Sequence, residues 1–343
     1  MNENVDQLKP LLAIVADGKS LSEEEAERAF EIIMTGNASP SQIGAFLMAL
    51  RVRGETVDEI TAAARIMRAK ATHIKAPDNA MDVVGTGGDG SGSLNVSTGA
   101  ALVVAGCGIP VAKHGNRALS SRAGAADVLT ALNVNIECDM PLIEKSIQEA
   151  GIGFMMAPRH HSATWHVAPT RVELATRTIF NILGPLSNPA DVRRLMVGVF
   201  AREWVEPLAQ VLRKLGAEKA WVVHGSDGLD ELTTTGPSTV AALENGTVKT
   251  FEVSPAEAGL PIAKAADLLG GDGAFNARAM TAMLSGEASA FRDIVIFSAA
   301  ASLIVADWAA DLKEAAAIAA AAIDSGKASK ALETMVRITN EGS

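Results

Sequence analysis

Residues 81–98 read MDVVGTGGDGSGSLNVST. This stretch predicts a strand, a loop and a helix, from which the fold of the larger part of the chain can be worked out. The apolar run at 81–84 is typical of a short strand, and Ser97-Thr98 opens a second apolar run that is typical of a helix. The glycines between them free the backbone to turn its N–H groups towards an anion. A strand, a glycine loop and a helix N-terminus together predict a phosphate site.

A cationic segment, Lys113-His114-Gly115-Asn116-Arg117, follows the next apolar run at 109–112. The pattern Gly-x-Gly-x-x-Gly at 85–90 also occurs in dinucleotide folds, but these need an acidic residue about 20 residues on, after the next strand. Lys113 stands there instead, which suits a phosphate and opposes a nicotinamide dinucleotide. A P-loop is excluded because no Gly-Lys-Ser/Thr follows four residues after a first glycine.

Length, net charge and cysteine content limit the classes of protein to which the chain can belong. The 343 residues are 48% hydrophobic, enough for two domains with a substantial core. The net charge of -10 argues against a general nucleic-acid surface and favours a small anionic metabolite. Cys107 and Cys138 have no paired spacing, which predicts neither a disulfide framework nor a zinc site and favours a reducing cytoplasm.

Two segments bear on targeting and membranes. Residues 1–6 lack the basic and apolar regions of a signal peptide, so we expect no export by that route. The alanine-rich stretch 298–322 is interrupted by charged residues and is therefore predicted to be a packed helix. We expect no membrane span.

Three capping boxes predict a small helical domain over residues 1–70. Ser22, Ser39 and Thr56 are each followed three residues later by Glu or Gln. Residues 72–80 are expected to form a linker, and helices from about 162–185 are expected to join the helical domain.

Residues 81–343 are expected to form a larger α/β domain, because short β-rich runs alternate with helical patterns there. We predict strands at 81–84, 110–113, 152–156, 195–200 and 220–224. The alternation indicates a mostly parallel sheet, and the runs 239–243 and 248–253, joined through Asn245-Gly246, predict a late antiparallel hairpin.

Asp230 and Glu231 follow the predicted strand 220–224 across a short loop. Carboxylates at the carboxyl end of a strand are suitable Mg²⁺ ligands, although a solvated acidic pair is the alternative. Arg171 and Arg177 are expected on a helix after Pro169, where a guanidinium could hold a planar carboxylate. Position does not say which arginine does so, and an ion pair with Glu173 is the alternative.

Two other kinds of site are not supported. His160, His161 and His166 lack the spacing of zinc peptidases. A serine hydrolase is likewise unsupported, because the chain has no Gly-x-Ser-x-Gly.

Five motifs carry a resemblance: 85–89, 95–98, 113–117, 177–186 and 227–231. Because these motifs occur in this order and span nearly the whole chain, the sequence resembles the anthranilate phosphoribosyltransferase family of tryptophan biosynthesis. The resemblance implies a nucleoside phosphorylase/phosphoribosyltransferase type of fold and a homodimer formed through the helical domain. It also implies Mg²⁺-assisted transfer of a 5-phosphoribosyl group from phosphoribosyl pyrophosphate to the amine of anthranilate.

The resemblance also implies site residues. The residues expected around phosphoribosyl pyrophosphate are Gly85, Gly88, Asp89, Ser93, Asn95, Val96, Ser97, Thr98, Lys113, His114, Gly115, Asn116, Arg117, Ala118, Leu119, Ser120 and Ser121. Those expected to bind Mg²⁺ are Ser97, Asp230 and Glu231. Anthranilate would bind at Gly85, Asn116 and Arg171, with Arg171 at its carboxylate, and would approach along His114, Ala157 and Pro158.

The sequence departs from the family pattern near this approach. Similar members carry His-Pro-Ala, a larger apolar residue and a basic residue where this chain has His161-Ser162-Ala163-Thr164-Trp165, and glycine where it has Ala175. If Ala175 has a positive φ, its methyl group costs about 1 kcal/mol or more.

Two rival classes share the fold: pyrimidine nucleoside phosphorylases and nucleic-acid-binding relatives. The segment 113–117 differs from the phosphate motif of the phosphorylases. The acidic balance and the retained Arg171, Asp230 and Glu231 oppose nucleic-acid binding.

Overall fold

The strand predicted at 81–84 becomes β1 (Met81–Gly85), an interior strand of a seven-stranded sheet. The computed structural model describes residues 7–118 and 122–342. The other strands are β2 (Val111–Gly115), β3 (Ile152–Met156), β4 (Arg194–Gly198), β5 (Lys219–Gly225), β6 (Ser238–Glu244) and β7 (Thr247–Val253). All the predicted strands are present, with ends that differ by at most a few residues.

The strand order is β3-β2-β1-β4-β5-β6-β7. The first five strands run parallel, and β6 and β7 form an antiparallel hairpin through Asn245 and Gly246, which both have positive φ. The predicted α/β class with a mostly parallel sheet is confirmed. Because β2 and β3 lie on one side of β1 and β4 lies on the other, the order reverses between β1 and β4. Ligands of open parallel sheets bind beyond the carboxyl ends of the strands at such a reversal.

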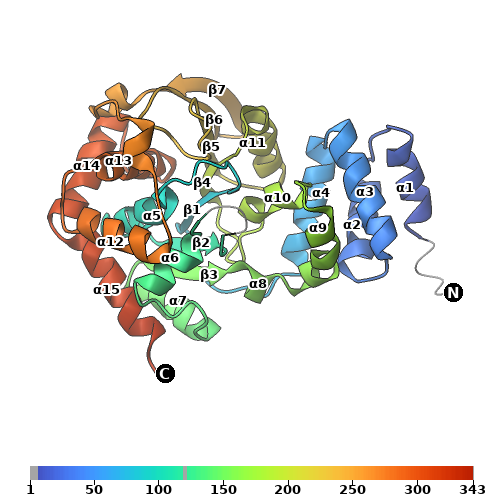
Figure 1. The fold of residues 1–343 in the computed structure, drawn as a ribbon, viewed down its shortest axis with the longest axis horizontal. Coiled ribbons are helices and arrows are strands. Elements are labelled where there is room, and N and C mark those ends of the chain that lie inside the picture. The colour runs from blue at the N-terminus through green and yellow to red at the C-terminus, as the bar shows by residue number, and fades with distance from the viewer. Residues whose placement is uncertain (1–6, 119–121, 343) are drawn as a thin grey trace.

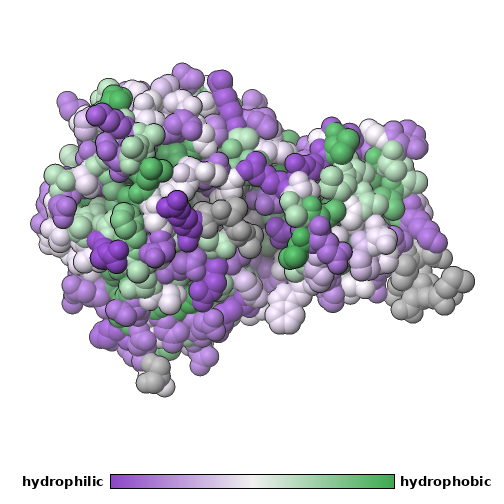
Figure 2. Space-filling view, viewed as in Figure 1, coloured by the Kyte–Doolittle hydropathy of each residue, from purple (hydrophilic) through white to green (hydrophobic). Residues whose placement is uncertain are grey.

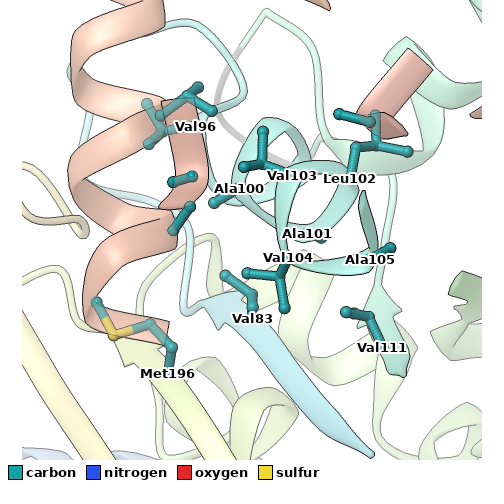
Figure 3. Packing of buried hydrophobic residues seen from close by; sticks show 14 of the residues in the cluster. Val83, Val96, Ala100, Ala101, Leu102, Val103, Val104, Ala105, Val111 and Met196 are labelled. Atoms are coloured by element: carbon teal, nitrogen blue, oxygen red, sulfur yellow. The ribbon is translucent and has the colours of Figure 1, made fainter. Parts of the chain in front are cut away.

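Helices cover both faces of the sheet (Figure 1). On one face, α5 (Val96–Gly106) and α13 (Ala290–Val305) form a buried apolar layer with β1 and β4. Figure 3 shows the side chains of α5 gathered near Val83 and Met196. The outer helices on this side are α12 (Gly273–Leu284), α14 (Leu312–Asp324) and α15 (Lys327–Thr339), with α6 (Ala125–Ala131) beside them. α7 (Met140–Glu149) contacts α15, but its buried Ile143 and Ile147 belong to the apolar cluster of the other face.

The N-terminal helices form a smaller lobe beside the sheet (Figure 1). They are α1 (Lys9–Ala16), α2 (Glu23–Met34), α3 (Pro40–Arg53) and α4 (Val57–Ala69). The three predicted capping boxes are confirmed: each cap side chain accepts the backbone N–H of the Glu or Gln three residues later, and that residue's side chain accepts the backbone N–H of the cap residue. Here α9 (Ala168–Leu174) packs against α3, and α4 packs against α11 (Val205–Lys214).

One apolar cluster runs from the helical lobe to the second face of the sheet. Phe30 packs edge-on against Phe46 and Phe180, with ring centroids 5.7 and 6.3 Å apart. Arg68 donates to the carbonyl of Leu186 over 2.7 Å. The helical lobe is therefore held on the sheet by a continuous core.

The remaining elements are short. They are α8 (Ala157–His160), α10 (Phe180–Leu183) and 3₁₀ turns at Ser162–His166, Gly184–Leu186, Arg202–Trp204, Pro255–Ala258 and Ala265–Leu268. In the described ranges, no helix has the length and apolar character needed to cross a membrane.

The alanine-rich stretch 298–322 was expected to be one helix, and this expectation is wrong. α13 ends at Val305, Asp307 has a φ of 59°, and α14 begins at Leu312. The carboxylate of Asp311 accepts the N–H of Glu314 over 2.8 Å and so caps the new helix. A left-handed residue followed by a strong N-cap ends one helix and starts another.

Candidate functional site

A cavity of about 330 Å³ lies at the carboxyl ends of the strands, where the strand order reverses. The loops after β1 and β2, residues of α8, α9 and α10, and the pair Asp230-Glu231 line it. Figure 2, in the view of Figure 1, shows hydrophilic residues interspersed with hydrophobic patches on both lobes. A cavity at the strand ends with convergent polar and charged side chains is the usual place for a small-molecule site in such a fold.

The glycine loop after β1 has the backbone conformation that its sequence predicted. Gly87, Gly88, Gly90 and Gly92 all have φ between 64° and 76°, a region that disfavours residues with side chains. The N–H of Gly87 donates to Asp230 Oδ2 over 2.6 Å. The loop is thereby joined to the acidic pair after β5.

The acidic pair faces the cavity. Glu231 Oε1 accepts the N–H of Ser97, in the first turn of α5, over 3.0 Å. Each carboxylate commits one oxygen to a backbone N–H and has a second oxygen. The pair is therefore built into the cavity wall and is not a solvated surface pair.

Burial gives this region unusual electrostatics. Burial, and secondly the neighbouring charge of Glu231, raises the pKa of Asp230 well above its usual value. Burial raises the pKa of Glu231 to about 7, against the effect of Lys113. Lys113 is buried, donates to the carbonyl of Val83 over 2.6 Å and lies 3.4 Å from Ser97 Oγ. Burial lowers its pKa.

The donor set fits a magnesium ion. Among residues 7–118 and 122–342, no group of three or more His, Cys, Asp or Glu could hold a metal by itself. Mg²⁺ is commonly bound by one or two carboxylates together with substrate phosphates. Two adjacent carboxylates beside a glycine loop satisfy that requirement. A bound cation would favour their charged forms, against the burial that raises both pKa values and the charge of Glu231 that also raises that of Asp230.

Two histidines form another wall of the cavity. The rings of His114 and His161 meet edge to face with centroids 5.0 Å apart. Nδ1 of His114 lies 3.1 Å from the carbonyl of Gly184, to which it donates as the Nδ1–H tautomer. In the described part of the chain, His114 Nε2 and both ring nitrogens of His161 are buried without a hydrogen-bond partner. Burial lowers the pKa of both rings, to about 4 for His161.

A buried carboxylate that the sequence reasoning missed supports the end of β2. Asp82 accepts the N–H of His114 over 3.2 Å and the side-chain amide of Asn188 over 2.7 Å. Burial raises its pKa to about 6. The sequence did contain a signal for this role, because Asp82 is an acidic residue within the apolar run predicted as a strand.

Arg171 lies on α9, and its guanidinium carbon is 5.5 Å from the centre of the Phe180 ring. Burial lowers its pKa. Within the described ranges Arg171 forms no ion pair, so the alternative of a pair with Glu173 is not supported. The cavity lined by the acidic pair is thus also lined by an arginine that can receive a carboxylate.

Arg177 is not on this helix, contrary to expectation. The helix ends at Leu174 because Ala175 takes the left-handed conformation, with φ 46° and ψ 32°. The Arg177 guanidinium instead donates to the carbonyl of Gly88 and lies 4.2 Å from the ring centre of Phe200. It braces the glycine loop.

Most of the predicted site residues line this one cavity. These are Gly85, Gly88, Asp89, Ser93, Asn95, Val96, Ser97, Lys113, His114, Gly115, Asn116, Arg117, Ala118, Ala157, Pro158, Arg171, Asp230 and Glu231. Thr98 is buried in α5 and is not in the lining. Leu119, Ser120 and Ser121 lie outside the described residues.

Some lining residues were not predicted as site residues. They include Met67, His161, Thr164, Phe180, Asn181, Gly184 and Pro185. The motif 177–186 signalled part of this set, whereas Met67 comes from the helical lobe and has no local signal. Of the departures, Thr164 donates to the carbonyl of His161 over 2.7 Å, and Trp165 is 70% exposed.

Comparison with known proteins gives one consistent result. Family models described as "Glycosyl transferase family, helical bundle domain" and "Glycosyl transferase family, a/b domain" match residues 9–71 and 77–329. The anthranilate phosphoribosyltransferase of Rhodospirillum rubrum is 63% identical over 97% of this chain and 96% of its own length.

Solved structures that resemble this chain belong to the same family as these sequence relatives. The anthranilate phosphoribosyltransferase from Thermus thermophilus is 42% identical with a TM-score of 0.91, over 96% of this chain and 98% of that one. The enzyme from Saccharomyces cerevisiae, in complex with PRPP and Mg, is 27% identical with a TM-score of 0.88, over 96% of this chain and 98% of that one.

Ala175→Gly should stabilise the protein by about 0.5–1 kcal/mol, because an alanine methyl group is strained at this positive φ. Equilibrium denaturation measures the change. Ala317→Gly, at an exposed alanine within α14, is the matched control and should destabilise by about 1 kcal/mol. Destabilisation by both variants would contradict the strain.

His161→Gln should reduce the loss of stability in acid. Burial lowers the pKa of His161 in the folded state from 6.5 to about 4. The stability that the neutral ring contributes to the folded state is therefore fully present above pH 6.5 and is lost as the pH falls towards 4. Between pH 7 and 5 the variant should lose about 2 kcal/mol less than wild type in free energy of unfolding. Denaturation at both pH values tests this, with exposed His166→Gln as the control. Equal losses in all three proteins would refute it.

Proposed function

The chain belongs to the anthranilate phosphoribosyltransferase family, and from that premise we propose that it transfers the 5-phosphoribosyl group of phosphoribosyl pyrophosphate to the amine of anthranilate. The products are N-(5-phosphoribosyl)anthranilate and pyrophosphate. One observation carries the proposal: a single cavity is lined by a glycine loop, by an acidic pair bonded to that loop, and by Arg171, which forms no ion pair among the described residues. Neither rival class, phosphorylase or nucleic-acid-binding relative, is favoured by any of the comparisons.

Phosphoribosyl pyrophosphate would lie along the loops after β1 and β2. The turned backbone of residues 87–92 offers N–H groups to phosphate oxygens, and the first turn of α5 adds its own. We assign to this substrate the residues from Gly85 to Thr98 and from Lys113 to Ser121 that the family resemblance implies. Thr98 could contribute through its backbone.

Ser97, Asp230 and Glu231 would hold Mg²⁺, which neutralises charge on the pyrophosphate when bound. The chain's own contribution is to hold the leaving group. Departure of pyrophosphate leaves oxocarbenium character at the anomeric carbon, and N–H donors fixed before the reaction stabilise the departing charge without reorganising. The anomeric C–O bond breaks, the C–N bond to the anthranilate amine forms, and the amine loses a proton. No covalent attack by an enzyme residue is needed.

Anthranilate would bind with its carboxylate on Arg171 and its ring near Gly85 and Asn116. It would enter past His114, Ala157 and Pro158, which line the same cavity. The support is electrostatic: a buried guanidinium that stacks on Phe180 leaves donors for a bidentate carboxylate.

The finer organisation is also proposed. Residues 1–70 and 81–343 would be separate domains, with the helices of 162–185 joined to the first, as the packing of α9 on α3 supports. We propose a homodimer formed through the helical domain, where Val52 and Val172 are exposed apolar residues. A cytoplasmic location is supported by the two free thiols, Cys107 and Cys138.

Asp230→Asn with Glu231→Gln should remove most of the Mg²⁺-dependent turnover and leave the fold intact. The amides keep the shape and lose the charge that holds the metal. The fluorescence loss of anthranilate, after addition of phosphoribosyl pyrophosphate and Mg²⁺, measures turnover. Asp78→Asn with Glu137→Gln makes the same charge change at exposed positions and should be silent. Wild-type turnover in the first variant would refute the metal assignment.

Arg171→Ala should raise the KM for anthranilate about 30- to 150-fold, because a buried bidentate carboxylate contact is worth roughly 2–3 kcal/mol. The KM for phosphoribosyl pyrophosphate should change far less. Steady-state kinetics with each substrate varied separates the two constants, and exposed Arg28→Ala is the control. Equal increases in both constants would mean that Arg171 supports the fold instead of binding the acid.

A further inference from the structure

We propose that Asn276, on α12, is a positioning residue that holds the phosphate site together by fixing Asn95. The inference rests on the proposed binding of phosphoribosyl pyrophosphate to the glycine loop. Asn276 does not line the cavity, and 181 residues separate it from Asn95.

The oxygen and the nitrogen of the Asn276 side-chain amide each form a hydrogen bond. Its side chain is 1% exposed. Nδ2 donates to Asn95 Oδ1 over 2.8 Å, and Oδ1 accepts the N–H of Gly271 over 2.8 Å. Because a buried amide with its oxygen and its nitrogen both bonded is held in that orientation, Asn276 fixes the rotamer of Asn95.

Asn95 in turn joins two loops. It ends the glycine loop and lies immediately before α5, and its Nδ2 donates to the carbonyl of Ala123 over 3.1 Å. An asparagine at this position usually caps the helix with its side chain, but Asn95 makes no such bond. Its amide therefore connects the glycine loop to the segment after β2 and leaves the N–H groups of the first turn for other acceptors. One of them, that of Ser97, goes to Glu231.

The backbone around Asn276 braces the same loop. Leu94 donates to the carbonyl of Leu268 over 3.0 Å, and Gly270 donates to the carbonyl of Gly92 over 2.8 Å. A side chain on Gly270 would place its Cβ 2.7 Å from the Ser93 carbonyl oxygen. Residues 268–271 therefore lie directly on the glycine loop.

The segment after β2, to which Asn95 donates, is also held in place near α12. Gly273, which begins α12, lies so close to Asp127 that a Cβ on Gly273 would be only 2.9 Å from the Asp127 carbonyl oxygen. The Asp127 carboxylate accepts the N–H groups of Ala118 and Gly124 over 3.0 and 2.8 Å. One short region around α12 thus supports both segments that are proposed to meet the phosphates.

Asn276→Ala should raise the KM for phosphoribosyl pyrophosphate about tenfold or more, because displacement of about 1 Å at binding groups has large effects on rate and binding. The KM for anthranilate should change less than about threefold, since Arg171 lies on α9 in another part of the cavity. Asn276→Asp provides a second variant: it keeps the shape and the acceptor for Gly271 but loses the donor to Asn95. It should show the same split.

The decisive experiment is a double-mutant cycle with Asn95→Ala. If Asn276 acts through Asn95, Asn276→Ala should add little to the KM effect in the Asn95→Ala background. Met280→Ala, at a fully buried residue of the same helix, controls for simple loss of helix stability and should leave the KM for phosphoribosyl pyrophosphate unchanged. Calorimetric titration with phosphoribosyl pyrophosphate and Mg²⁺ should show the matching loss of affinity.

The outcomes separate the two proposals. Additive effects in the cycle, or an equal effect of Met280→Ala, would overturn the role of Asn276 while leaving an active enzyme. A wild-type protein that neither binds phosphoribosyl pyrophosphate nor consumes anthranilate would overturn the proposed function itself.

Discussion

The site depends on one close backbone approach, at the end of β4. A Cβ on Gly198 would lie 1.6 Å from the carbonyl oxygen of Asp230. A Cβ on Gly85 would lie 2.5 Å from the Asp230 carboxylate oxygen Oδ2. These two glycines pair with one another at the ends of β4 and β1. Only because neither has a side chain can the loop after β5 fold over both strands. That fold brings Asp230 and Glu231 to the N–H groups of Gly87 and Ser97.

The same approach gathers charge that a protein interior disfavours. Asp230, Glu231 and Asp82 all have pKa values raised by burial, and Lys113 is the buried cation that opposes the shift at Glu231 and Asp82. Lys113 cannot balance three carboxylates by itself, so the region favours an additional cation when the acids are ionised. Such an arrangement lowers stability, and it is the kind of perturbed titration that gathers at functional sites.

Local patterns predicted much of this molecule, because capping boxes, strands and a hairpin depend on neighbouring residues. The boxes at Ser22, Ser39 and Thr56 and every predicted strand are present, and the family inferred from the motifs is confirmed. The failures involve contacts or conformations that spacing does not encode. Periodicity continued through the break at Asp307, whose left-handed conformation no apolar pattern signals. The bond between Asn276 and Asn95 and the lining by Met67 arise only when distant segments pack.

The two halves of the cavity are mechanically linked although they come from different parts of the chain. Arg51, on α3 of the helical lobe, donates to the carbonyl of Arg177, and the guanidinium of Arg177 donates to the carbonyl of Gly88. Arg171 lies on α9, which packs on the same α3. The proposed carboxylate site and the proposed phosphate site thus share one support. Reaction between two bound molecules requires their atoms to be held about 3–3.5 Å apart, so a shift of the helical lobe would alter that separation without removing any contact to either ligand.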